Sequence, residues 1–310
     1  MRKTIKFNVL VSIVAVCAFL LSSQALAEMR FPGAVEVLMD FVANHGDATV
    51  TNGLATSASE WERSGDAQMP GMFLHPKGAG DAVLEFADVA VPASREGEVC
   101  FLVFNVGLRP GFDWDAQPNT PNGVRFSVAI DGKVVFEEDV AEDGWKPRAV
   151  DMAPWAGKEV SVGFHTNAIS GNTNYDWAVY GEPLLVRVRP ATDIESLPRK
   201  AKGLAIVEVD CREAGTALIN LGDSQVAAAL KPGTHAIPVA FENAAAPRLT
   251  VESGVVTIAN VYAGLYRPDL EIVSTDLSSP LVTAGRPFSI VQRIRNAGRG
   301  TYTGGGTWRL

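Results

Sequence analysis

The chain of 310 residues has little of what metal centres, disulfide frameworks and nucleophilic active sites require. It contains 3 cysteines and 4 histidines, and the histidines are dispersed at positions 45, 75, 165 and 235 without the spacing of metal ligands. The motifs G-x-S-x-G and H-E-x-x-H and the Walker loop are absent from the sequence. Catalysis therefore finds no support in these residues, and we expect a protein that is not an enzyme.

Basic clusters are also scarce, and the clearest group of cations stands at the N-terminus. Arg2, Lys3 and Lys6 precede an apolar run over 9–21 and the small residues at 25–27, which is typical of a secretory signal peptide spanning 1–27. The apolar run is shorter than the roughly 20 residues of a membrane-spanning helix. Cleavage removes three cations and takes the formal charge from −8 to −11. We therefore predict an exported protein, extracellular or periplasmic, that neither inserts in a membrane after cleavage nor binds nucleic acid.

Only Cys100 and Cys211 remain after cleavage of the leader. Cys100 lies within EVCFLVFNVGL, where a small buried thiol is the expected role. A disulfide between the two cysteines is compatible with export, and the sequence leaves that pairing open.

Sustained helical periodicity is absent, and short strands separated by Gly, Pro, Asp and Asn take its place. GVRFSVAI alternates apolar and other residues, Asp131-Gly132 follows as a hairpin turn, and KVVFEEDV returns. EVCFLVFNV is almost continuously apolar, which is typical of a central strand covered on both faces. These patterns predict an all-β protein built on a β-sandwich.

Composition shifts divide the mature chain into three parts. The first β-rich part spans 28–188, and a linker with two prolines and a charge run covers 189–203. A small β domain at 204–267 is short for an independent core, so we expect it to pack on the first part. The last part, 268–310, holds 43 residues, whereas an immunoglobulin-type sandwich needs about 100. We therefore expect an incomplete domain and a chain that is a fragment of a longer product.

The first part resembles the galactose-binding-like jelly rolls that bacteria append to secreted carbohydrate enzymes. The residues that carry the likeness are NGVRFSVAIDGKVVFEEDV (122–140), GWKPRAVDMAPWAGKEVSVGFHT (144–166) and YDWAVYGEPLLV (175–186). They are similar to the NPCBM family of carbohydrate-binding modules. The resemblance implies a jelly-roll sandwich over half of the chain, and it implies a sugar ligand less strongly because this fold hosts unrelated functions.

The last part resembles the CARDB family, the cell-adhesion-related domain found in bacteria (the related APHP pattern is similar). PDLEIVSTDLSSPLVTAGRPFSIVQRIRNAG has the leading Asp-Leu strand, the G-x-P turn and the strand ending in R-N-x-G. The sequence stops before the later strands of that pattern. The resemblance implies an extracellular spacer or adhesion module without catalysis.

The loop GFDWDAQPNTPNG at 111–123 is the main candidate for a carbohydrate-binding site. Trp114 offers an aromatic face for the C–H surface of a sugar, and Asp113, Asp115 and Asn122 offer hydrogen-bond partners for its hydroxyls. An ordinary turn whose Trp folds back as a lid fits the same residues equally well. Trp61, in SASEWERSG, joins this site if an early loop brings it alongside.

The same loop is also a candidate for a structural calcium ion, held by oxygen atoms of Asp113, Asp115 and Asn119. The spacing is not that of an EF-hand, because Pro118 stands at the glycine position. No other cofactor is expected.

A second aromatic stretch, GNTNYDWAVYGE at 171–182, fits a structural role better than a binding role. In a strand that completes the sandwich, Trp177 and Val179 share one face and Asp176 and Tyr180 the other. We expect the Trp177 indole to face the core. The polar residues at 171–174 then form a loop at the rim of the sandwich.

The leading hypothesis is a secreted, non-catalytic carbohydrate-binding protein whose rim loops bind a polysaccharide or a cell-surface glycan weakly. One alternative is a structural or adhesion protein of the bacterial cell surface. A second alternative is the accessory N-terminal part of a glycoside hydrolase whose catalytic domain lies beyond residue 310.

Overall fold

The computed structural model describes residues 34–78, 80–95, 97–110, 123–169, 173, 176–190, 202–243, 247–266, 270–277, 290–296 and 299, with only the backbone of 34, 270–277 and 290–296. The predicted signal peptide therefore lies outside the described residues. Strands dominate the described part of the chain, and its helical elements are two single 3-10 turns, η1 (His45–Asp47) and η2 (Ala153–Trp155). The all-β prediction is confirmed.

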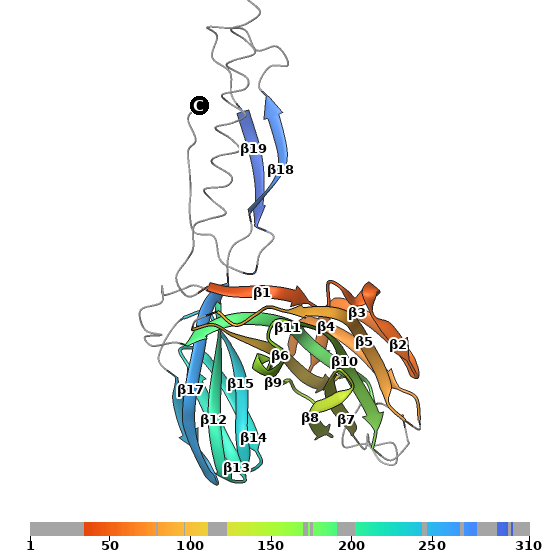
Figure 1. Cartoon of the computed structure of the whole chain (residues 1–310), viewed down its shortest axis with the longest axis vertical. Helices are drawn as coiled ribbons and strands as arrows, with labels where there is room; N and C mark the ends of the chain where they lie inside the picture. Colours follow the sequence, from red (N-terminus) through yellow and green to blue (C-terminus); the bar gives the residue numbers. More distant parts are fainter. Residues whose placement is uncertain are drawn as a thin grey trace, which may run out of the picture.

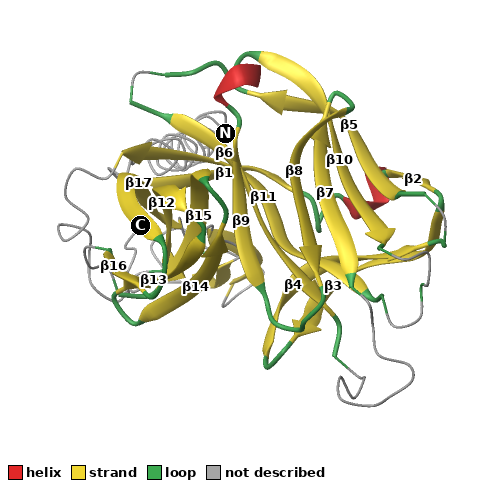
Figure 2. Ribbon diagram, turned by 90° about the horizontal axis from the view of Figure 1, so that it is seen from below, coloured by secondary structure: helices red, strands yellow, loops and turns green. Residues whose placement is uncertain are grey.

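Two sheets face each other in the first sandwich, and both are visible in Figure 2. The strands of one sheet are, in spatial order, β9 (Lys146–Asp151), β6 (Val99–Leu108), β11 (Ala178–Pro190), β4 (Ala67–Pro76) and β3 (Gly53–Ser64). The strands of the other sheet are β2 (Thr49–Thr51), β5 (Ala82–Val91), β10 (Lys158–Ala168), β7 (Val124–Ile130) and β8 (Lys133–Val140). Aromatic rings from both sheets fill the space between them, with edge-on contacts among Phe104, Phe126, Phe164 and Tyr180.

A smaller sandwich follows. It packs β12 (Gly203–Glu213), β15 (Gly233–Phe241) and β17 (Val255–Tyr266) against β14 (Ser224–Leu230), β13 (Gly215–Leu221) and β16 (Arg248–Val251). Along β12, Ala205, Val207 and Val209 face this core, while Leu204 and Ile206 face the opposite side. A strand with apolar residues on both faces must be covered on both, and a third core meets this need.

That third core is the interior of a closed barrel shared by the two sandwiches. β1 (Ala34–Asp40) pairs with β11 and with β17, and the pairings then run through β12, β15, β9 and β6 back to β11. Residues from all seven strands fill the interior, with the Phe101 and Tyr262 rings 5.1 Å apart. Figure 1 shows β1 starting at the end of β17 and running beside β11. The small unit thus packs on the first sandwich, as expected, by sharing its hydrogen-bonded sheet.

Local sequence patterns explain most of these strands. In the β7–β8 hairpin, Asp131 and Gly132 have φ of 50° and 74°, as the turn chemistry predicts. β6 is covered on both faces, with Leu102 and Phe104 in the first core and Phe101 in the barrel. The alternation in β7 was expected to leave one face exposed, but Ser127 and Ala129 are also buried.

The two cysteines are free and buried in different cores, Cys100 in the first sandwich and Cys211 in the second. The disulfide left open by the sequence is therefore not formed.

A two-stranded hairpin of β18 (Leu270–Leu277) and β19 (Ile290–Asn296) stands away from the sandwiches in Figure 1. Both strands lie within the last part of the chain, 268–310. No helix among the described residues is long and apolar enough to cross a membrane.

Candidate functional site

Several loops of the first sandwich gather at one end, where β6 ends beside the start of β11. Leu108 pairs with Ala178 there, and Ala168 at the end of β10 pairs with Val124 at the start of β7. The connections at 77–81, 109–123, 141–145 and 169–177 all leave from this end. We call it the rim. A cluster of loops on a rigid sandwich is the usual position for a binding site.

Most of the sequence-predicted binding residues belong to a rim loop that lies outside the described part of the chain. Asp113, Trp114, Asp115, Asn119 and Asn122 all fall within 111–122. The structure does describe where this loop begins and ends.

Arg109 stands at the start of that loop and is held in place by three contacts. Its guanidinium makes two hydrogen bonds to the carboxylate of Glu62, at 2.7 and 2.6 Å, and lies 3.8 Å from the centroid of the Phe73 ring. Its backbone N–H donates to the carbonyl of Trp177 at 2.9 Å. Two-point binding by a carboxylate that is 3% exposed, combined with a ring contact, fixes the arginine rigidly. Its side chain is 31% exposed, and Nη1 has no described hydrogen-bond acceptor.

Gly123 stands at the other end of the loop with φ of 95°. A Cβ there would lie 2.8 Å from the carbonyl oxygen of Val140, so a residue with a side chain does not fit at position 123.

The Trp145 indole lies close to the backbone of Gly107 and Gly181. A Cβ on Gly107 would lie 3.0 Å from the indole, and a Cβ on Gly181 would lie 2.8 Å from it. The indole N–H donates to the carbonyl of Ala67 at 3.0 Å, in the turn that joins β3 to β4. Trp145 therefore ties this hairpin to the sheet, which is a structural role.

Trp61 is the most exposed large hydrophobic residue in the described part of the chain, at 72%. The sequence left its position open, with an early loop as one possibility, and the structure places it on strand β3, at a register shift between Ser59 and Glu62. A shift of this kind adds a residue to one strand and changes the direction of its side chains. The next residue, Glu62, binds Arg109, so Trp61 lies near the start of the 111–122 loop on a rigid support.

Asp176 is the unusual charged group of the rim. It is 0% exposed, and neither oxygen of its carboxyl group has a hydrogen-bond partner. Burial raises its pKa from 3.8 to about 7. Sequence reasoning placed Asp176 on the same face as Tyr180 but did not identify it as an isolated carboxyl group, because the signal lies in what surrounds it.

The prediction that Trp177 faces the core is wrong. Tyr180 is fully buried there, with its hydroxyl 2.6 Å from the carbonyl of His165 and 2.9 Å from that of Ser127, while Trp177 is half-buried outside the core cluster. The alternation of the strand was correctly inferred, but its direction was not. Tyr180 occupies the core position because its hydroxyl donates to carbonyl oxygens of the opposite sheet.

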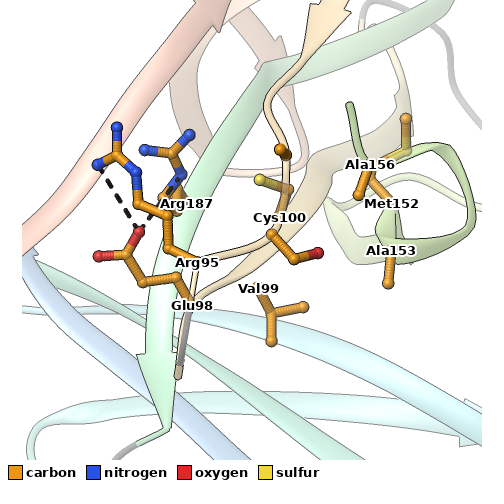
Figure 3. Close-up of a pocket in the computed structure, with 10 residues that line it drawn as sticks. Arg95, Glu98, Val99, Cys100, Met152, Ala153, Ala156 and Arg187 are labelled. Atoms are coloured by element: carbon orange, nitrogen blue, oxygen red, sulfur yellow. Dashed lines mark ion pairs between the residues drawn. The ribbon is translucent and has the colours of Figure 1, made fainter. Parts of the chain in front are cut away.

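A small hollow of about 80 Å³ lies at the opposite end of the sandwich, between the β5–β6 and β9–β10 connections. Figure 3 shows Glu98 beside Arg95 and Arg187, with Cys100 next to them. Arg187 is 5% exposed and donates to Glu36 at 2.9 Å. Burial raises the pKa of the Cys100 thiol, which makes it a poor nucleophile. The hollow is far smaller than the 300–1,000 Å³ typical of ligand pockets. We therefore interpret it as a packing gap beside the ion pairs of Glu98 with Arg95 and Arg187.

No group of three or more His, Cys, Asp or Glu side chains that could hold a metal ion occurs within the described residues. The candidate calcium ligands Asp113, Asp115 and Asn119 lie outside those residues.

No protein-family model matches the chain. No curated protein matches it either. Among solved structures, one similar chain is a CBM51 module from a Clostridium perfringens GH95 protein in complex with methyl-galactose, at 13% identity and a TM-score of 0.32. The match covers 47% of this chain and 98% of that module.

Two tandem-module structures are also similar. The tandem CBM51 modules of a family 98 glycoside hydrolase from Streptococcus pneumoniae have 10% identity and a TM-score of 0.30, with 74% of this chain and 93% of that one covered. The tandem CBM22 domains of a Paenibacillus barcinonensis protein have 10% identity and a TM-score of 0.31, with coverages of 75% and 90%. TM-scores near 0.3 carry no argument about a ligand, and function is therefore argued below from this chain's own residues.

Proposed function

We propose that this chain is an exported, non-catalytic protein that binds a glycan at the rim of its first sandwich. The observation that carries the proposal is the 72% exposure of Trp61 on a rigid strand, one residue from the Glu62–Arg109 pair. An exposed indole offers a flat apolar surface on which a ligand with an apolar face can stack. The C–H surface of a pyranose ring is such a face, and its hydroxyls need donors and acceptors close by.

Arg109 supports the proposal because it supplies those donors without further ordering. Its guanidinium is already fixed by Glu62 and Phe73, so using the N–H groups of Nη1 costs little conformational entropy. The sequence of the adjacent loop adds Trp114 with Asp113, Asp115 and Asn122 as further partners. Export follows from the predicted signal peptide, and we expect the binding to be weak.

The test uses the full mature chain in a glycan panel read by tryptophan fluorescence. Trp61→Ala and Trp114→Ala are each expected to lower affinity about tenfold, because stacking on an aromatic ring is worth on the order of 1.4 kcal/mol. Leu54→Ala is the matched control, since Leu54 lies on the same strand, is 54% exposed and has no ring. The melting temperature should be unchanged in all three variants. Failure to bind any glycan, or binding by both Trp variants with the affinity of the wild-type chain, would overturn the proposal.

A structural role is the second candidate, favoured by the barrel that joins the two sandwiches into one sheet. A rigid spacer of a bacterial surface protein needs such a junction and does not need an exposed indole. The same glycan panel distinguishes the two roles, because a spacer has no glycan binding that depends on Trp61 or Trp114.

Calcium binding by Asp113, Asp115 and Asn119 remains a prediction. Calorimetry with Ca²⁺ on the full chain tests it: heat of binding together with a raised melting temperature is the expected result. The absence of both effects would contradict the prediction of calcium binding.

A further inference from the structure

The C-terminal hairpin leaves the body of the protein and returns to it at one place. Leu270 at the start of β18 pairs with Asn296 at the end of β19. Tyr266, the last residue of β17, comes four residues before this pair, and Arg299 comes three residues after it. Arg299 is therefore held near the point where the chain leaves the barrel.

Arg299 meets two carboxylates that belong to the first sandwich. Its Nη2 donates to Asp40 Oδ2 at 2.8 Å, and its Nη1 donates to Glu182 Oε1 at 2.9 Å. Asp40 ends β1 and Glu182 lies on β11. All three side chains are about 70% buried, so solvent and salt screen the contacts less than those of an ordinary surface pair.

Both carboxylates are set in position by the first sandwich itself. The other oxygen of Asp40, Oδ1, accepts hydrogen bonds from the N–H groups of Val42 and Ala43 at 3.0 and 3.1 Å, which leaves Oδ2 free for Arg299.

Glu182 has φ of 43°, in a region that residues with a Cβ rarely occupy, at the register shift of β11. Residues in such strained conformations cluster at ligand clamps and switch regions.

We propose that Asp40 and Glu182 form a clamp for a guanidinium, and that Arg299 occupies it so as to dock the segment carrying β18 and β19 on the first sandwich. Each carboxylate takes one N–H of the planar fork, whereas a lysine can contact the same carboxylates only as a point charge. The clamp fixes the direction in which the C-terminal segment leaves the body. It is independent of the proposed glycan site.

A zero-length cross-link tests the contact directly. The Arg299→Lys variant keeps the charge and provides an amine, which a carbodiimide joins to a carboxylate only where the two are in contact. We expect mass spectrometry to find residue 299 linked to Asp40 or Glu182, and to lose that product when the variant also carries Asp40→Asn and Glu182→Gln. Lys202 and Glu242, whose charged atoms lie 3.7 Å apart, serve as an internal control for the reaction and for folding. A Lys202–Glu242 product without the product at 299 overturns the proposal.

Solution scattering tests the consequence. Arg299→Glu places a third negative charge at the clamp and should change the radius of gyration of the full chain, because the segment that stands away from the sandwiches in Figure 1 can then take other directions. Salt at about 1 M should have a smaller effect of the same sign on the wild-type chain. Arg212→Glu, an exposed change on β12, is the matched control and should leave the profile unchanged. Equal profiles for Arg299→Glu and the wild-type chain would show that the ion pairs do not hold the segment, even where the cross-link forms.

Discussion

Replacing Asp176 with asparagine perturbs the one described carboxyl group at the rim that is buried without any partner. Asparagine has nearly the same shape as a protonated aspartic acid but does not titrate, so the substitution removes the pH-dependent cost of ionisation. The carboxyl group is 0% exposed, and its oxygens make no hydrogen bond. Desolvation is the sole cause of its raised pKa of about 7.

The sign of the effect follows from where the proton is bound. In the unfolded chain the group loses its proton near its usual pKa of 3.8, whereas in the folded protein it keeps the proton up to about pH 7. Between these values the folded state binds more protons, so the free energy of unfolding decreases as pH rises. The full loss is reached above pH 7 and is at most about 4 kcal/mol, of which roughly 3 kcal/mol arises above pH 5.

Urea unfolding of the full chain at pH 5 and pH 8, with EDTA present, measures this loss. The advantage of Asp176→Asn over the wild-type chain should grow by up to about 3 kcal/mol between the two pH values. Asp66→Asn is the matched control, because Asp66 is fully exposed in the β3–β4 turn. An advantage that is equal at both pH values would refute the reasoning, since it would mean that the folded protein does not retain this proton.

Three further changes test the packing that supports the rim and the barrel. Tyr180→Phe removes the hydroxyl that reaches carbonyls of the opposite sheet at 2.6 and 2.9 Å, and should lower the free energy of unfolding by about 1–3 kcal/mol in urea titration. Gly107→Ala places a methyl group 2.6 Å from the hydroxyl of Ser64 and should lower the melting temperature, whereas Gly46→Ala, with no atom within 4 Å, should not. A chain cut after Pro190 exposes the barrel side of β6 and β11, so it should bind a hydrophobic dye and melt earlier than the full chain. A truncated chain with the stability of the full one would show that the barrel contributes nothing.

Strand positions and turns were predictable from the sequence because they depend on neighbouring residues. The alternation in GVRFSVAI and the Asp131-Gly132 turn both reflect local geometry, and both strands of this hairpin are found where expected. The continuous apolar run of EVCFLVFNV likewise indicated a strand covered on both faces. What covers the second face was not predictable, since Leu204 and Ile206 of β12 and Tyr262 of β17 come from distant parts of the chain.

The candidate site shows the same limit at the level of single residues. The sequence offered Trp61 for the site and Trp177 for the core, but exposure of the first and partial burial of the second depend on strand pairing. Neither Arg109 nor Asp176 has a motif. The rigidity of Arg109 arises from Glu62 and Phe73, which are 47 and 36 positions away, and the isolation of Asp176 arises from the absence of a partner. A composition-based search finds aromatic and acidic loops. The sequence alone does not show whether a fixed arginine stands beside such a loop. The fold decides this by bringing Glu62 to Arg109, so that the arginine loses little conformational entropy when a ligand binds.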